Sequence, residues 1–208
     1  MSLLTTWGYT IEDAETLADM LTVEEFDEFT SGKYSGDDRT APNIAAASSA
    51  IRNYCGWHVY PSASCKLSTS FFDRRVSCSG SAVLVQLPAR FVSAVTSVTI
   101  GGIEYTSYVF EPSGLLKVYG AELAGLHEWT PIEVVYTAGV PSEFMDGIKE
   151  LVAHRATHAL ASSGGVQSET AGGVSITYSA NWTNSARATA LADDNKEVLT
   201  PYRLQGVF

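Results

Sequence analysis

The sequence predicts an α+β protein in which a helical core carries an inserted antiparallel β subdomain. Apolar residues recur at helical spacing in two stretches, residues 42–55 and 142–162. Between them, residues 58–139 contain short runs of valine, threonine, serine and tyrosine separated by glycine and proline, which is typical of strands and turns. A β-rich segment between two helical patterns indicates an insertion.

Helices are expected in the rest of the chain, on both sides of the β region. Residues 41–57 and 140–208 form the expected helical core, with an apolar stripe on the longest helix made of Phe144, Ile148, Leu151, Val152, Ala159 and Leu160. Residues 1–40 predict short acidic helices, because Thr10-x-x-Asp13 and Thr22-x-x-Glu25 have the spacing of a capping box. A last helix ends at Pro201, since proline cannot continue it.

Strands are expected at residues 65–71, 82–87, 94–100, 103–110, 114–118 and 132–137. Gly101-Gly102 predicts a hairpin turn, because glycine tolerates the positive φ of two-residue turns. Trp57 directly follows the glycine that ends the first long helix. We therefore expect Trp57 and Ile51 to anchor the junction between the helical part and the β subdomain.

The sequence shows no arrangement of residues that predicts catalysis or a cofactor. Cys55, Cys65 and Cys78 lack CxxC spacing, which favours buried reduced thiols over disulfides or a zinc site. No GxSxG elbow, phosphate-binding glycine loop with lysine or dinucleotide fingerprint occurs. We expect no enzymatic activity and no cofactor.

One group of residues resembles a metal site. Glu150, His154 and His158 are spaced four apart on one helix face. A HExxH metalloprotease needs glutamate directly after the first histidine, where this chain has Arg155. Histidine near a helix end also interacts favourably with the helix dipole, so a structural role is favoured. A small metal-dependent hydrolase is the alternative from the enzyme class.

The net charge of the chain argues against a role in wrapping DNA. The net charge is -10, and acidic residues are concentrated within residues 11–28, which we interpret as a solvated helix face. Arg74 and Arg75 lie in a predicted loop, where such pairs are usually solvated or ion-paired. No stretch approaches the ~18 apolar residues of a membrane span, and the start lacks signal-peptide features.

Segments of the chain follow one another in an order that chance rarely produces. They are AAASSAIR (45–52) leading to Cys55-Gly56-Trp57 and Pro61, LVQLP (84–88), VTSVTIGG (95–102), VVYTAG (134–139) with Pro141, GVQSE (165–169), GGVS (172–175) and LTPYRL (199–204). This order resembles the head-tail connector (adaptor, head completion) family of long-tailed bacteriophages over about residues 40 to 205.

The resemblance implies a helical connector-type fold with a β insertion and a structural, non-enzymatic virion protein. Such proteins form a ring, expected here to be a dodecamer, in the neck between the portal and the stopper or tail-side proteins. The implied ring is assembled in the host cytoplasm, and DNA passes through its lumen without sequence-specific binding. An acidic wall suits that passage, because like charge opposes tight contact with DNA. A tail-terminator or other tail-side ring protein is the alternative from the same assembly class.

Two segments are candidate interfaces. In the glycine-rich arm at 164–178, a strand without an obvious local partner is expected to pair with a neighbouring subunit, and an intrachain hairpin is the alternative. The ring contact is assigned to Gly172, Gly173, Val174, Ile176 and Tyr178. Portal or neck docking is assigned to the last segment, Pro201 to Phe208, through Tyr202, Arg203 and Phe208. These residue types are common in interface hot spots, and they follow a helix-breaking proline, where an isolated chain is expected to gain little from them.

Overall fold

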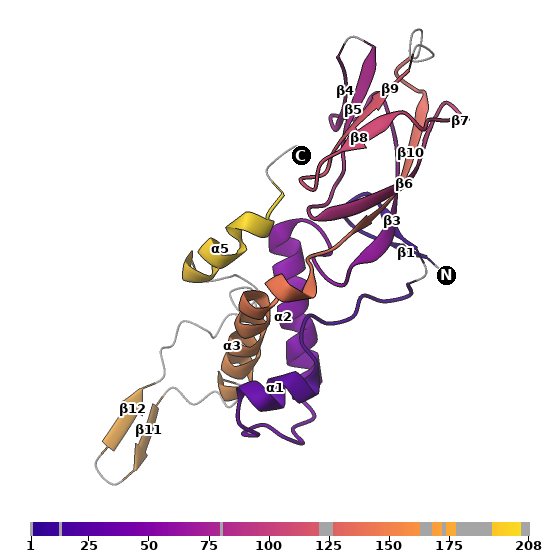
Figure 1. The fold of residues 1–208 in the computed structure, drawn as a ribbon. Helices are drawn as coiled ribbons and strands as arrows, with labels where there is room; N and C mark the ends of the chain where they lie inside the picture. Colours follow the sequence, from indigo (N-terminus) through magenta and orange to yellow (C-terminus); the bar gives the residue numbers. More distant parts are fainter. Residues whose placement is uncertain are drawn as a thin grey trace. The chain divides into compact units, whose positions relative to one another are not determined.

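The computed structural model describes residues 2–12, 14–79, 81–120, 127–162, 168–171, 174–177 and 193–204. The chain forms two compact units (Figure 1). Unit 1 comprises Met1–Ala18, Cys55–Glu143 and Tyr202–Phe208, and unit 2 comprises Asp19–Tyr54 and Phe144–Pro201. Unit 1 contains the large antiparallel sheets and unit 2 the α-helices, so the α+β prediction is confirmed. None of the described helices is long and apolar enough to cross a membrane.

Unit 1 is built from strands. In chain order they are β1 (Leu3–Leu4), β2 (Thr10–Ile11), β3 (Ala63–Ser70), β4 (Val76–Ser79), β5 (Ala82–Gln86), β6 (Val92–Ile100), β7 (Ile103–Glu104), β8 (Tyr108–Phe110), β9 (Leu115–Tyr119) and β10 (Pro131–Ala138). One sheet has the order β1-β2-β3-β10-β6-β7, and a second has the order β4-β5-β9-β8. All of these pairings are antiparallel.

β10 lies inside the larger sheet, between β3 and β6. Its alternate residues Ile132, Val134, Tyr136 and Ala138 are all 0% exposed, which is the period-two pattern of a strand with one buried face. The predicted strands at 65–71, 82–87, 94–100, 114–118 and 132–137 are confirmed, with ends that differ by a few residues. The hairpin turn is confirmed too, since Gly101 and Gly102 have φ of 60° and 83°.

The predicted single strand at 103–110 is wrong. The chain forms β7 beside β6 and then β8 in the other sheet. Between them, the Tyr105 N–H donates to the Val98 carbonyl at 2.8 Å, and the Tyr105 side chain is buried. Burial of Tyr105 fixes the point at which the chain leaves the first sheet. The alternation of apolar and polar residues along 103–110 does not reveal this point.

The two capping-box signatures have different outcomes. Thr22 caps α1 (Val23–Phe29): its Oγ1 accepts from the Glu25 N–H at 3.2 Å, and the Glu25 carboxylate accepts from the Thr22 N–H at 2.9 Å. The helix expected from Thr10 is wrong, because Thr10 and Ile11 form β2 and pair with β3. Ile11 is 0% exposed, so tertiary pairing and burial overrode the local signal.

Unit 2 contains the helices. They are α1, α2 (Thr40–Cys55, which runs one residue into unit 1), α3 (Asp146–Ser162) and α5 (Asp193–Leu199). The 3-10 turn η2 (Ser142–Phe144) precedes α3, and the 3-10 turn η4 (Thr200–Tyr202) follows α5. The long helix was expected from Ser142, but that stretch is η2 and α3 begins at Asp146. Phe144 and Ala159 are exposed, so neither belongs to the buried stripe; Met145 is buried instead.

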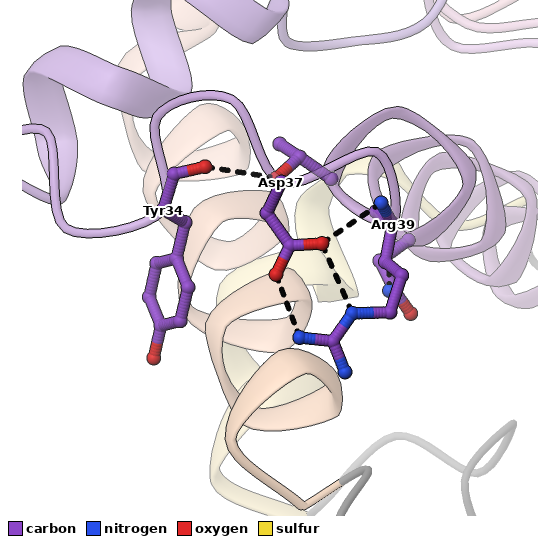
Figure 2. A network of polar contacts seen from close by, with 5 residues as sticks. Tyr34, Asp37 and Arg39 are labelled. Atoms are coloured by element: carbon purple, nitrogen blue, oxygen red, sulfur yellow. Dashed lines mark hydrogen bonds and ion pairs between the residues drawn. The ribbon is translucent and has the colours of Figure 1, made fainter.

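The turn that enters α2 is held by Asp37 (Figure 2). The Asp37 carboxylate accepts from the Arg39 N–H at 3.0 Å, from Nε at 3.0 Å and from Nη2 at 2.6 Å. The Asp37 N–H donates to the Tyr34 carbonyl at 3.0 Å. Hydrogen bonds from Arg39 lower the pKa of Asp37 to about 2. The pair is solvated, so it shapes the turn more than it stabilises the fold.

Candidate functional site

Tyr202 to Leu204, three described residues of the expected docking segment, are anchored within unit 1. Trp57 Nε1 donates to the Tyr202 carbonyl at 2.7 Å, and the Leu204 N–H donates to the Cys55 carbonyl at 3.0 Å. The Tyr202 ring stacks on Phe91, with ring centres 5.8 Å apart and an interplanar angle of 24°. The expectation that an isolated chain gains little from Tyr202 is therefore wrong.

This anchoring shapes what the segment can present to a partner. The Tyr202 ring is half-buried and Arg203 is exposed beside it, while Phe208 lies outside the described residues. A segment that is already ordered loses less conformational entropy when it docks. Tyrosine and arginine are also the residue types that most often dominate interface energies.

The arm contains a hairpin of its own. β11 (Ser168–Ala171) pairs with β12 (Val174–Thr177) antiparallel, with Ser168 opposite Thr177 and Ala171 opposite Val174. The expectation of an unpaired strand is wrong, and the alternative, an intrachain hairpin, is what the structure contains. The reason is that a short connection brings the two strands together at little entropic cost. Val174 and Ile176 lie in β12, whereas Gly172, Gly173 and Tyr178 lie outside the described residues.

The hairpin forms a two-stranded sheet, with no third strand among the residues that the structure describes. A two-stranded sheet is marginally stable in water unless another surface supports it. Each strand also keeps one edge whose backbone groups face away from its partner. The hairpin thus has the geometry of an element that can receive a further strand.

The two helical histidines are brought together. His154 and His158 are exposed on α3, with ring centres 4.5 Å apart and an interplanar angle of 60°. Partial burial, followed by repulsion from His154, lowers the pKa of His158. Within the described ranges, no group of three or more His, Cys, Asp or Glu side chains is placed to hold a metal. Glu150 is exposed on α3, four residues before His154.

Arg75 has a structural partner. Its Nη2 lies 2.7 Å from Asp73 Oδ2, and Thr69 also donates to this carboxylate at 2.8 Å. A Cβ added to Gly8 would lie 3.3 Å from Arg75 Nη1, so the guanidinium packs against the N-terminal segment. Arg74 is exposed. The ion-pair interpretation of this loop is thus confirmed for Arg75.

Two of the three cysteines match the prediction. Burial raises the pKa of both the Cys55 and Cys65 thiols to about 12, so they are inert side chains of the core. Cys78 is exposed on β4, where burial was expected. All three are free thiols.

The Asp73–Arg75 pair predicts a pH dependence of stability. Hydrogen bonds from Arg75 lower the pKa of Asp73 to about 2, against an ordinary value of 3.8. A lowered folded-state pKa stabilises the protein above pH ~4, and that contribution, about 2 kcal/mol, is lost as the pH falls towards 2. Asp73→Asn should therefore lower the free energy of unfolding by about 1–2 kcal/mol at pH 7.

Urea unfolding at pH 7, 4 and 2.5 tests this prediction. The wild type should lose more stability between pH 4 and 2.5 than Asp73→Asn does. Asp37→Asn is the matched control, because Asp37 makes the same kind of contact with Arg39 in a solvated turn, and its effect should be smaller. Equal pH profiles for the wild type and Asp73→Asn would contradict the assignment.

Sequence reasoning missed one surface feature. Phe72 and Trp129 are 67% and 73% exposed and stack face to face, with ring centres 5.5 Å apart and an interplanar angle of 8°. They follow β3 and precede β10 at one end of the ladder, where the Phe72 N–H donates to the Glu128 carbonyl at 3.0 Å. Only the β3–β10 pairing brings them together, so no local motif marks them.

No family model matches this chain, and no curated protein matches it. Among solved structures, it is similar to a chain from the neck of an empty GTA (gene transfer agent) particle computed with C6 symmetry. The TM-score is 0.50 at 14% sequence identity, and the match covers 94% of this chain and 96% of that chain. In fold, the chain is therefore similar over nearly its whole length to a neck protein of a phage-like particle.

Proposed function

We propose that this chain is a structural subunit of the neck of a phage-like particle, of the head-tail connector (adaptor) type. The observation that carries this proposal is the fold similarity to a GTA neck chain, which spans 94% of this chain and 96% of the other. The order of sequence segments that resembles the connector family supports it independently. Its role is assembly, without catalysis or a cofactor.

In the proposed assembly, copies of the chain form a ring beneath the portal and receive the stopper or tail-side neck proteins. The sixfold symmetry of the neighbouring neck is compatible with rings of six or twelve copies, and we favour the dodecamer. DNA passes through the lumen, and the net charge of -10 opposes tight contact with its phosphates. The ring is assembled in the host cytoplasm and becomes part of the virion.

The hairpin β11–β12 is the proposed ring contact, and its register shows which backbone groups are available. Residues that flank a two-residue hairpin connection form a hydrogen-bonded pair, and bonded and non-bonded pairs alternate from there. Ala171 and Val174 are the flanking pair. The Ile176 N–H therefore points to Glu169 inside the hairpin, whereas the Ser175 and Thr170 N–H groups point outward.

This geometry gives a sharp test of ring formation. Ser175→Pro removes an outward donor of β12 and Thr170→Pro an outward donor of β11, while each leaves the inner hydrogen-bonded pairs intact. Native mass spectrometry of the full-length chain, alone and with portal protein, should show wild-type rings. We expect at least one of the two variants to stay monomeric while circular dichroism shows an unchanged fold.

Ile176→Pro is the companion variant, since it breaks the hairpin internally and should also abolish rings. If Ser175→Pro, Thr170→Pro and Ile176→Pro all form rings like the wild type, the hairpin is not the ring contact. If the wild type forms no ring on the portal either, the connector assignment itself fails. Arg203→Ala distinguishes the ring contact from the docking segment, because it should weaken portal binding without preventing ring formation.

A further inference from the structure

We propose that His154 and His158 form a two-histidine binding site for a divalent transition metal ion, Ni²⁺ or Cu²⁺. The site lies on α3 alone, and it depends neither on ring assembly nor on the proposed neck function. It is a binding site without catalysis, because the described residues around it supply no third metal ligand.

The first support is the spacing along the helix. Residues four apart on an α-helix lie on one face, separated by about 40° around the axis. Both histidines are exposed, so an ion can reach them from solvent. Imidazole nitrogen is a preferred ligand of copper and nickel ions.

The second support is the distance between the rings. A metal–nitrogen bond of about 2.1 Å places an ion about 3.2 Å from the centre of the imidazole that binds it. Two imidazoles in neighbouring positions about 90° apart then have centres about 4.5 Å apart, and about 5.2 Å at a tetrahedral angle. The observed separation of 4.5 Å, with the rings in an edge-to-face arrangement, is short enough for one ion to bridge the two imidazoles. Cu²⁺ is the divalent first-row ion that nitrogen sites generally bind most tightly, and Ni²⁺ directly precedes it in the same order of affinity.

The electrostatic setting is compatible with an ion. Glu150 is exposed one helical turn before His154, and the chain is acidic overall, so the local field does not repel a cation. Water fills the remaining coordination positions.

Isothermal titration of the tag-free, full-length chain with NiCl₂ and with CuCl₂ at pH 7.5 tests the site. We expect one ion per chain, with at least a tenfold loss of affinity in His154→Ala and in His158→Ala. The matched control is H158A/A159H, which keeps the number of histidines but moves the second ring to about 140° around the helix from His154. That variant should bind as weakly as His158→Ala, while His127→Ala should bind like the wild type.

Circular dichroism shows whether each variant keeps its helices. Should H158A/A159H lose helical signal, His154→Ala decides the question, because this exposed position tolerates alanine. Binding by H158A/A159H with wild-type affinity would overturn the proposal, as would wild-type affinity in His154→Ala or no measurable binding of either ion by the wild type.

Discussion

Replacing Trp57 by alanine is expected to lower the free energy of unfolding by about 3–5 kcal/mol. Trp57 is 0% exposed and is the largest fully buried side chain among the residues that the structure describes. Its indole packs edge-on against His58, with ring centres 5.3 Å apart. The substitution leaves a large cavity and removes the donor that holds the Tyr202 carbonyl.

Trp57→Phe separates packing from hydrogen bonding. Phenylalanine keeps most of the buried ring but lacks the N–H group, so the loss should be closer to about 1–2 kcal/mol. Urea unfolding followed by circular dichroism measures both variants without depending on tryptophan fluorescence. A loss well below 1 kcal/mol in Trp57→Ala would show that Trp57 does not anchor unit 1 as its burial indicates.

Gly114→Ala is the second substitution with a large expected effect. Gly114 is buried in the turn between β8 and β9 with φ of +93°, and a Cβ would lie 2.4 Å from the Ala89 carbonyl oxygen and 3.0 Å from that of Leu87. The left-handed backbone costs alanine about 1–2 kcal/mol, and the clash with backbone atoms adds about 1–3 kcal/mol. The total loss should be about 2–5 kcal/mol.

Gly102→Ala is the matched control for this effect. Gly102 has a similar φ of +83° in unit 1, but nothing lies within 4 Å of its added Cβ. It should lose only the backbone part, about 1–2 kcal/mol, and thermal unfolding of both variants isolates the contribution of the clash. Equal losses in the two variants would show that the turn at Gly114 relaxes away from the Leu87 and Ala89 carbonyl groups.

Candidate interfaces and sites were predictable from the sequence only in part. The spacing of His154 and His158 is enough to place them on one helix face, but their ring separation needed the structure. The arm was recognised, but the pairing of β12 with β11 was not, because the same residues suit an exchanged strand and a local hairpin. The stack of Phe72 on Trp129 unites two turns far apart in the chain.

Local pattern was sufficient wherever the interactions that fix an element are themselves local. The capping box at Thr22, the alternation along β10 and the Gly101-Gly102 turn each depend on neighbours within a few residues or on the period of one strand. The α+β class follows from these elements. Tertiary structure alone determined that Thr10 and Ile11 pair with β3, that residues 103–110 divide between two sheets, and that Tyr202 lies on Phe91. In each of these cases burial against distant segments outweighs a local preference of a few tenths of a kcal/mol.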